Sequence, residues 1–278
     1  MNAFDARRDA AFDSERPGDP GQRRQSGRRL PQAMPRAGCV ELRDVWFGYG
    51  GHEILRGISF QVTGAEILCV LGGSGEGKTT ILRLILRLLR PDRGEIYVEG
   101  RNIADASTQE VLEIREHIGM VFQGSALFDS LSVFDNVAFP LREHTDLDEE
   151  AIRARVEEVL CFVDLELDQV APLLPAEISG GMRKRVGIAR AIVHEPDILL
   201  FDEPTSGLDP ITTRTINELI LKLQREMGVC AVVVTHDIRS AACIAGRLAL
   251  LREGRIVFMG SPEEMFASED AYVRAFVG

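Results

Sequence analysis

The sequence predicts an α/β fold with a parallel-sheet core, antiparallel β strands and a helical subdomain. Short apolar runs at residues 66–71, 198–201 and 229–234 have the length and composition of strands that are buried on both faces of a sheet. Between the last two runs, residues 212–227 carry apolar side chains at helical spacing. This β–α–β order favours parallel strands, since a helical connection returns the chain to the edge from which the next strand starts.

The elements before the core are predicted in chain order. Residues 40–47 alternate between apolar and polar side chains, which predicts a strand, and residues 54–62 predict a second one. The strand at 66–71 leads through a glycine-rich loop into a helix that is expected to end near Pro91. A short strand bounded by glycines is predicted at residues 94–100.

The middle of the chain changes from strand to helix. A strand is predicted at residues 118–122, and residues 148–164 carry apolar side chains at helical spacing. We therefore place a helical subdomain at about residues 124–196, inside one domain that covers residues 39–278. Residues 262–276 predict a last helical stretch.

The composition of residues 1–38 predicts a disordered basic tail. They contain eight arginines and five acidic residues, and they are rich in proline, glycine, serine and glutamine. Their acidic residues and the lack of an apolar core argue against a targeting signal. A solvated tail is the simpler interpretation, and weak contact of its arginine pairs with anionic lipid headgroups is the alternative.

Composition excludes several classes of protein. The net charge of −11 argues against a general nucleic-acid-binding surface, so we expect no nucleic-acid partner. The five cysteines form no C-x-x-C pair, and Cys69 and Cys230 fall in predicted buried strands, as expected for core thiols in a reducing compartment. No apolar run approaches the ~18 residues of a membrane-spanning helix. We therefore expect a protein of the cytosol or of the cytosolic side of a membrane.

The loop after the strand at 66–71 has the form G-x-x-x-x-G-K-T of a phosphate-binding loop. Its residues are Gly72, Gly73, Ser74, Gly75, Glu76, Gly77, Lys78 and Thr79, and Thr80 follows in the helix. The glycines allow backbone N–H groups to point at phosphate oxygens, and the helix N-terminus adds partial positive charge. Lys78 is expected to reach the β- and γ-phosphates and Thr79 to ligate Mg²⁺. The alternative is a glycine-rich turn that binds nothing, and the predicted strand before the loop and helix after it argue against this alternative.

Two further strands end in residues that suit hydrolysis. Asp202 and Glu203 follow the run at 198–201, where ligands bind in parallel sheets. We expect Asp202 to hold the Mg²⁺ shell and Glu203 to polarise the attacking water. His236 ends the run at 229–234 and is expected to hold water and phosphate in line. The alternatives are a loop-facing acidic pair and a structural histidine.

Three weaker signals complete the pattern. Gln123 ends a predicted strand and offers Mg²⁺ a neutral oxygen, although it could be an ordinary polar loop residue. The sequence Ser179-Gly180-Gly181 opens a predicted helix, which makes it an anion-site candidate of low specificity. Asp209 lies in a tight turn soon after the acidic pair.

The order of these motifs resembles the nucleotide-binding subunits of ABC transporters, over residues 39–278. The resemblance implies that two copies bind ATP and Mg²⁺ between them in head-to-tail order. Ser179 and Gly181 of one copy would face the γ-phosphate held by Lys78 of the other, and Asp209 would lie at the seam. Tyr49 matches the aromatic residue that stacks on adenine, with Trp46 and Phe47 expected in the core.

A narrower resemblance is to the Mla-type, or Mce-associated, phospholipid transport ATPases. It rests on residues 124–128, 132–145 and 202–212, and on Met182, where most ABC subunits have glutamine. It implies ATP-driven phospholipid transport between bacterial membranes, at the cytoplasmic face of the inner membrane. The implied partners are an integral-membrane permease, with a small regulatory subunit and an Mce-type substrate-binding protein as further candidates.

Two departures and two alternatives accompany this resemblance. Glu76 places an acid in the phosphate loop, and the chain ends at Gly278, whereas some Mla-type subunits carry a longer C-terminal arm that embraces the partner. The first alternative is the ATPase subunit of an importer for amino acids or metals. The second is a soluble ABC ATPase that acts on DNA or ribosomes, for which the sequence lacks long heptad repeats and a second cassette.

Large apolar side chains cluster between residues 127 and 139. The simpler interpretation is that they fill the core of the helical subdomain. That subdomain is small, so we expect some of them to stay exposed. Phe128 and Phe134 are predicted to line a groove that receives a short cytoplasmic helix of the permease.

Overall fold

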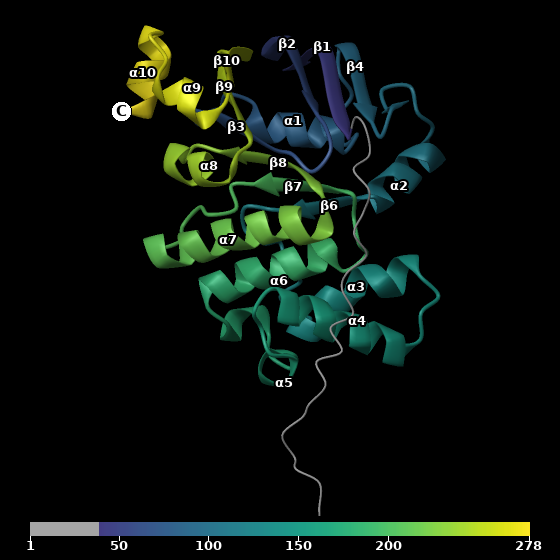
Figure 1. Cartoon of the computed structure of the whole chain (residues 1–278). Coiled ribbons are helices and arrows are strands. Elements are labelled where there is room, and N and C mark those ends of the chain that lie inside the picture. The colour runs from purple at the N-terminus through teal and green to yellow at the C-terminus, as the bar shows by residue number, and fades with distance from the viewer. Residues whose placement is uncertain (1–38) are drawn as a thin grey trace, which may run out of the picture. The chain divides into compact units, whose positions relative to one another are not determined.

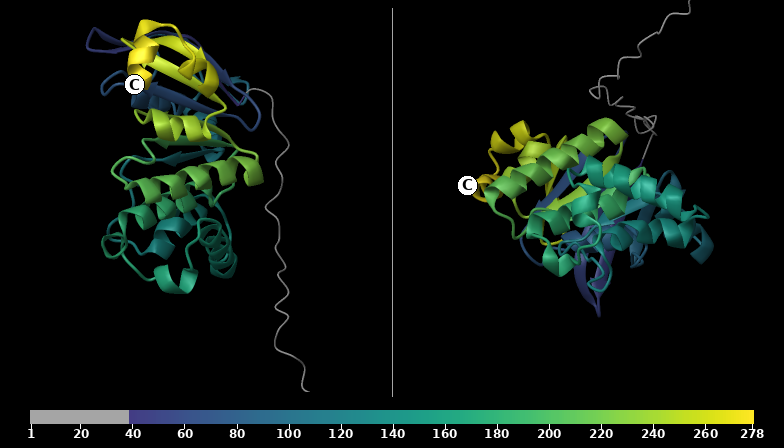
Figure 2. Two further views of the ribbon diagram at one scale, coloured as in Figure 1. Left: turned by 60° about the vertical axis from the view of Figure 1, so that its left-hand side comes forward. Right: turned by 90° about the horizontal axis from the view of Figure 1, so that it is seen from below.

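The computed structural model describes residues 39–278, and the predicted basic tail at 1–38 lies outside the described residues (Figure 1). Two sheets form the framework of the described part. Figures 1 and 2 show the antiparallel sheet and the helices α3 to α6 on opposite sides of the larger, mainly parallel sheet. No helix between residues 39 and 278 combines the length and the apolar character needed to cross a membrane.

The antiparallel sheet has the strand order β2-β1-β4-β5. Its strands are β1 (Val40–Tyr49), β2 (His52–Val62), β4 (Arg93–Val98) and β5 (Arg101–Asn102). Buried and accessible side chains alternate along much of β1 and β2, because one face of this sheet packs on the core and the other meets solvent.

The larger sheet has the strand order β10-β9-β3-β8-β7-β6. Its strands are β3 (Ile67–Gly72), β6 (Ile118–Val121), β7 (Ile198–Asp202), β8 (Cys230–Thr235), β9 (Arg247–Arg252) and β10 (Arg255–Gly260). All pairs are parallel except the pair between β9 and β10. Every residue of β3, β7 and β8 is buried, which explains why these strands are continuous apolar runs in the sequence.

Helices cover both faces of the parallel sheet. They are α1 (Lys78–Ile85), α2 (Thr108–Glu116), α7 (Pro210–Met227), α8 (Ile238–Ile244), α9 (Pro262–Phe266) and α10 (Ala271–Val277). Helix α1 contacts β4 on one side and β3, β7 and β8 on the other, so it lies between the two sheets. Helix α7 lies on the face of the parallel sheet opposite to α1 (Figure 1), and it packs against α8 and α6.

The segment between β6 and β7 is helical. It contains α3 (Val133–His144), α4 (Glu149–Phe162), α5 (Leu167–Val170), the 3-10 helix η1 (Pro175–Glu177) and α6 (Gly180–Ile192). The side chains of Ser132, Asp148 and Ser179 cap α3, α4 and α6 by accepting backbone hydrogen bonds. Helix α6 contacts α3 and α4. The assignment of residues 124–196 to a separate subdomain stays a prediction.

Several expectations need correction. Residues 262–276 form two short helices, because Ser268 to Asp270 interrupt them and Asp270 caps α10. Helices α2 and α8 and strands β9 and β10 were not predicted from the sequence. Phe47 is buried as expected, but Trp46 is only partly buried. Its indole N–H donates to Asp44 Oδ1 at 2.9 Å, and the Arg93 guanidinium lies over the ring.

Candidate active site

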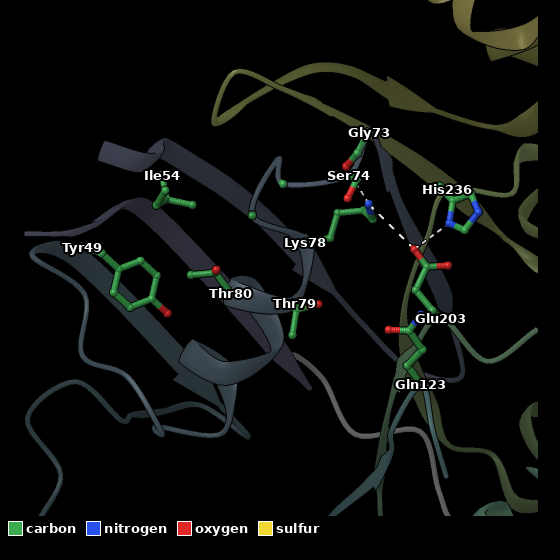
Figure 3. Close-up of a pocket in the computed structure, with 12 residues that line it drawn as sticks. Tyr49, Ile54, Gly73, Ser74, Lys78, Thr79, Thr80, Gln123, Glu203 and His236 are labelled. Atoms are coloured by element: carbon green, nitrogen blue, oxygen red, sulfur yellow. Dashed lines mark hydrogen bonds and ion pairs between the residues drawn. The ribbon is translucent and has the colours of Figure 1, made fainter. Parts of the chain in front are cut away.

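Most of the predicted site residues gather at one edge of the parallel sheet. Strands β3, β6, β7 and β8 all end at this edge, so the residues that follow them meet (Figure 3). A cavity of about 660 Å³ opens there. Its lining consists of Tyr49, Ile54, Gly73, Ser74, Gly75, Gly77, Lys78, Thr79, Thr80, Gln123, Glu203 and His236.

The loop between β3 and α1 depends on glycine at two positions. Gly75 and Gly77 have φ values of +83° and +98°, which side chains rarely adopt. A Cβ at Gly77 would also approach the side chains of Ile54 and Leu55 to 2.9 Å. Only a glycine therefore lets the loop turn into the N-terminus of α1, where backbone N–H groups are left for a ligand.

Lys78 places a buried ammonium at the centre of the cavity. Its Nζ donates to the carbonyls of Gly72 at 2.9 Å and Gly73 at 2.8 Å. It also lies 3.8 Å from Glu203 Oε1 (Figure 3). Burial lowers the pKa of the Lys78 ammonium, and the negative charges of Glu203 and Asp202 oppose this shift. The site thus holds a positive charge that is poorly solvated and suited to an anionic ligand.

Glu76 does not line the cavity, although it belongs to the loop. Its Oε2 accepts a hydrogen bond from the backbone N–H of Glu253, in the turn between β9 and β10. The acid therefore ties the loop to the neighbouring hairpin, while its negative charge still acts on the Lys78 ammonium and opposes the lowering of its pKa.

Glu203 is held on both carboxylate oxygens. Oε1 lies 2.9 Å from His236 Nδ1, and Oε2 accepts a hydrogen bond from the Thr235 hydroxyl at 3.0 Å. Its backbone has a left-handed φ of 48°, and its N–H donates to Val234 O. A glutamate in this conformation costs roughly 1–2 kcal/mol, which these contacts offset. Thr235 was not predicted as a site residue, and its position directly before His236 was the only signal for it in the sequence.

Thr79 and Asp202 bring two oxygens together beside Lys78. The Thr79 hydroxyl donates to Asp202 Oδ1 at 3.0 Å. Burial raises the pKa of the Asp202 carboxyl, and the hydrogen bond from Thr79 opposes that rise. Gln123 is exposed, and its Nε2 donates to Ser206 Oγ at 3.3 Å, so its amide oxygen can still act as a ligand. Hydroxyl, carboxylate and amide oxygens are the donors that suit Mg²⁺.

Tyr49 lies at the far end of the cavity from Glu203 (Figure 3). Its side chain is 47% exposed and meets the Phe47 ring edge-on, with ring centroids 4.8 Å apart. Ile54 lines the same end, although no motif in the sequence marked it as a site residue. An accessible aromatic ring beside an aliphatic side chain can accept a flat apolar ligand.

Seven predicted residues do not line the cavity. Gly72, Glu76 and Asp202 lie directly beside residues that line it, whereas Ser179, Gly180, Gly181 and Asp209 belong to the N-terminal ends of α6 and α7. Ser179 is exposed and caps the N-terminus of α6. Gly181 lies against α7, where a Cβ would come within 2.6 Å of Thr212. Asp209 is exposed and caps α7 by accepting from the N–H groups of Ile211 and Thr212.

Lys184 contacts the backbone of two site residues, and the sequence did not predict this. It lies on α6, is 6% exposed, and donates from Nζ to the backbone carbonyls of Gln123 and, at 3.3 Å, of Glu203. Arg183 and Arg185 flank it in the sequence, and a run of three cations is normally exposed, so a surface position was expected for Lys184.

A second group of titratable side chains lies away from the cavity. His117 Nδ1 lies 3.1 Å from Asp197 Oδ2 and 3.9 Å from Glu99 Oε2. His117 and Asp197 precede β6 and β7, so this group lies at the edge of the sheet opposite the phosphate loop. We therefore assign it no part in the nucleotide site.

A phosphate loop on one strand, an Asp-Glu pair on the next but one and a histidine between them define a P-loop ATPase of the ATP-binding cassette class. The chain belongs to the ABC transporter family, whose family model matches residues 55–206. It is an ATP-binding, ATP-hydrolysing member of that family.

The relatives include transport ATPases with different stated substrates. The chain is 43% identical to the intermembrane phospholipid transport system ATP-binding protein MlaF of Escherichia coli K12, over 87% of this chain and 89% of MlaF. It is 40% identical to MlaF of Haemophilus influenzae, over 86% and 89%. It is 38% identical to the probable ribonucleotide transport ATP-binding protein mkl of Mycobacterium leprae, over 88% and 70%.

Solved structures of cassettes share the fold. CbiO1 from Clostridium perfringens, part of the ABC transporter complex cbiONQ, matches with a TM-score of 0.77 and 32% identity, over 87% of this chain and 95% of its own. The cassette MJ0796, a dimer in a post-hydrolysis state with ADP and Pi, matches with a TM-score of 0.73 and 34% identity, over 80% and 98%. Cassettes of this family form dimers and work with membrane components in transporters.

Proposed function

We propose that this chain is the ATP-hydrolysing subunit of an ABC transporter that powers phospholipid transport between bacterial membranes. The observation that carries the proposal is the 43% identity with MlaF of Escherichia coli over nearly the full length of both chains. The alternatives are an ABC importer for amino acids or metals, and transport of ribonucleotides, as the name of mkl states for that protein.

In the proposed reaction, water attacks the γ-phosphate of ATP. The Glu203 carboxylate accepts a proton from that water, and His236, 2.9 Å from Glu203, holds water and phosphate in line. Lys78 and the N–H groups of the loop 72–79 bind the β- and γ-phosphates. Tyr49 stacks on adenine at the other end of the cavity. Thr80, in the first turn of α1, completes the phosphate-binding side.

The side-chain oxygens beside Lys78 fit a magnesium ion. Thr79, Asp202 and Gln123 would hold it, with Asp202 acting through water. When bound, the ion neutralises phosphate charge as it develops in the transition state. The raised pKa of the Asp202 carboxyl supports this assignment, because a desolvated carboxylate gains from a nearby cation.

Hydrolysis requires two copies in our proposal. Ser179, Gly180 and Gly181 lie at the accessible N-terminus of α6, and Asp209 at that of α7, outside their own cavity. We propose that these residues complete the nucleotide site of a second copy in head-to-tail order. The N-terminus of an α-helix attracts phosphate, which supports a γ-phosphate contact at Ser179 and Gly181.

A groove suits the permease. It has a volume of about 330 Å³ and exposes Phe122, Phe128 and Phe139, with His194 and Arg190 among its polar residues. We propose that residues 124–196 form a helical subdomain that receives a short permease helix here, at the cytoplasmic face of the inner membrane. The exposed ring of Phe128 and its contact with Phe139, at 4.9 Å between centroids, support a docking role.

The prediction for Phe134 is wrong, since this residue does not line the groove. Its ring is partly buried, with the Arg142 guanidinium 5.7 Å from its centroid. Residues that are five positions apart on a helix point in different directions. Phe139, five residues after Phe134 on α3, therefore faces the groove in place of Phe134.

Reconstitution tests the proposal. The full chain is purified with its membrane partners, among which a small regulatory subunit and an Mce-type protein are expected, and phospholipid movement between vesicles is measured with ATP. Phe128→Asp should lose permease association and transport but retain ATP binding. Leu112→Asp, at an exposed leucine on α2 outside the groove, is the matched control. A complex that moves amino acids, metals or ribonucleotides and no phospholipid refutes the proposal.

A further inference from the structure

Lys184 occupies an unusual position for a lysine. It lies in the first half of α6 with 6% of its surface exposed. A buried ammonium loses its hydration, so hydrogen-bond partners in the protein must replace the water. The flanking arginines bind elsewhere: Arg183 donates to Ile178 O and Arg185 to Asp164 O. The lysine alone of the three points toward the nucleotide site.

The partners of Lys184 belong to two different catalytic segments. One is the backbone carbonyl of Gln123, in the segment after β6, and the other is that of Glu203, the residue after β7. Strands β6 and β7 are neighbours, so a single ammonium spans both segments (Figure 3 shows Gln123 and Glu203). Hydrogen bonds from a charged donor are stronger than those between neutral groups, so the ammonium restrains both carbonyls.

The Glu203 carbonyl is a sensitive point of attachment. This residue has a left-handed backbone, with φ 48°, and its carboxylate is held by His236 and Thr235. A peptide in that conformation is stable only where its surroundings restrain it. Loss of the Lys184 contact would let the peptide rotate and move the carboxylate away from the line of attack.

Helix α6 also begins at the surface that meets the second copy in our proposal. Ser179 caps this helix, and Lys184 lies five residues further, about 7.5 Å along the axis. A helix of this length moves as a rigid rod, so a shift of its N-terminus also shifts Nζ against Gln123 and Glu203.

We propose that Lys184 is a positioning residue that couples the two ATP sites: it transmits γ-phosphate contact at the N-terminus of α6 to Gln123 and Glu203 of its own copy. This inference rests on the head-to-tail dimer proposed above. According to the proposal, ATP bound in one site positions the Glu203 carboxylate of the other site, and the Lys184 side chain carries this effect.

Mixed dimers of the full chain, built from two differently tagged copies, test the proposal. In the trans dimer, one copy carries Lys184→Met and the other Glu203→Gln, so the active site is the one whose Glu203 has lost its lysine. In the cis dimer, one copy carries both changes, and the active site keeps its lysine. The reference dimer carries Glu203→Gln in one copy only.

We expect the trans dimer to hydrolyse ATP at least tenfold more slowly than the reference and the cis dimer to match the reference. A lysine that merely stabilises α6 predicts the reverse, because the altered helix of the cis dimer contributes Ser179 to the active site. Slow hydrolysis in the cis dimer, or equal rates in all three, overturns the proposal.

Three measurements make the result specific. The affinity of single copies for ATP should stay within about twofold, which places the loss in kcat and not in KM. Lys184→Arg keeps the positive charge and the hydrogen-bond donors, and it should restore at least a third of the rate. Lys184→Gln should behave like Lys184→Met. If Lys184→Met does not fold, Lys184→Gln takes its place in the mixed dimers. If Ser179→Arg leaves hydrolysis intact, the dimer model itself is wrong, independently of Lys184.

Discussion

His194 should make the protein lose stability in mild acid, and its replacement by glutamine should remove that loss. The residue follows α6 and lines the groove that exposes Phe128. Its ring bonds to the backbone of Ile118, and Nδ1 has no hydrogen-bond partner among residues 39–278. Burial lowers the pKa of His194 from 6.5 to about 4, and the nearby positive charges of His144 and Arg155 add to the shift.

The sign and size follow from proton linkage. Between pH 6.5 and 4 the unfolded chain binds a proton at this histidine and the folded protein does not, so the free energy of unfolding falls as pH falls. Above pH 6.5 both states are neutral and the effect vanishes. Each pKa unit corresponds to about 1.4 kcal/mol, which gives a loss of about 2 kcal/mol at pH 5 and about 3 kcal/mol at pH 4.

Urea unfolding at pH 7.5 and pH 5 measures this effect. The decrease in unfolding free energy between the two pH values should be about 2 kcal/mol smaller in His194→Gln than in the parent. His52→Gln is the matched control, because this histidine is exposed and lies outside the groove. Equal pH dependence in His194→Gln and the parent would refute the reasoning, as would an equal effect of His52→Gln.

Three further predictions concern the nucleotide site. Glu203→Gln should bind ATP, lower turnover by roughly 10²–10⁴-fold and accumulate as an ATP-bound dimer in size-exclusion chromatography, whereas parental turnover would show that another base acts. Lys78→Ala should weaken ATP binding by about 2–3 kcal/mol in a calorimetric titration, and an unchanged affinity would argue against the loop. Ser179→Arg should bind ATP as a single copy without hydrolysing it, and mixing with Lys78→Ala copies should restore one working site per dimer. Activity of Ser179→Arg alone contradicts the head-to-tail arrangement.

The sequence by itself determined the features that depend on short stretches of chain. The glycines and Lys78 of the phosphate loop are contiguous, and the loop takes its form from its own backbone requirements, such as the positive φ at Gly77. Asp202 and Glu203 were placed because a strand buried on both faces can carry acids only where it ends. These local rules, with the order of the motifs, were enough for the fold class and the family.

Only the tertiary structure decided which distant segments meet. Lys184 contacts the segments after β6 and β7 from a helix that the sequence presents as a row of surface cations. The tertiary fold also turned Glu76 toward Glu253 and chose Phe139 over Phe134 for the groove. In each case the side chain's direction is set by neighbours far away in the sequence. Local periodicity and composition carry no record of such contacts, because the packing energy that selects them arises only once the elements are assembled.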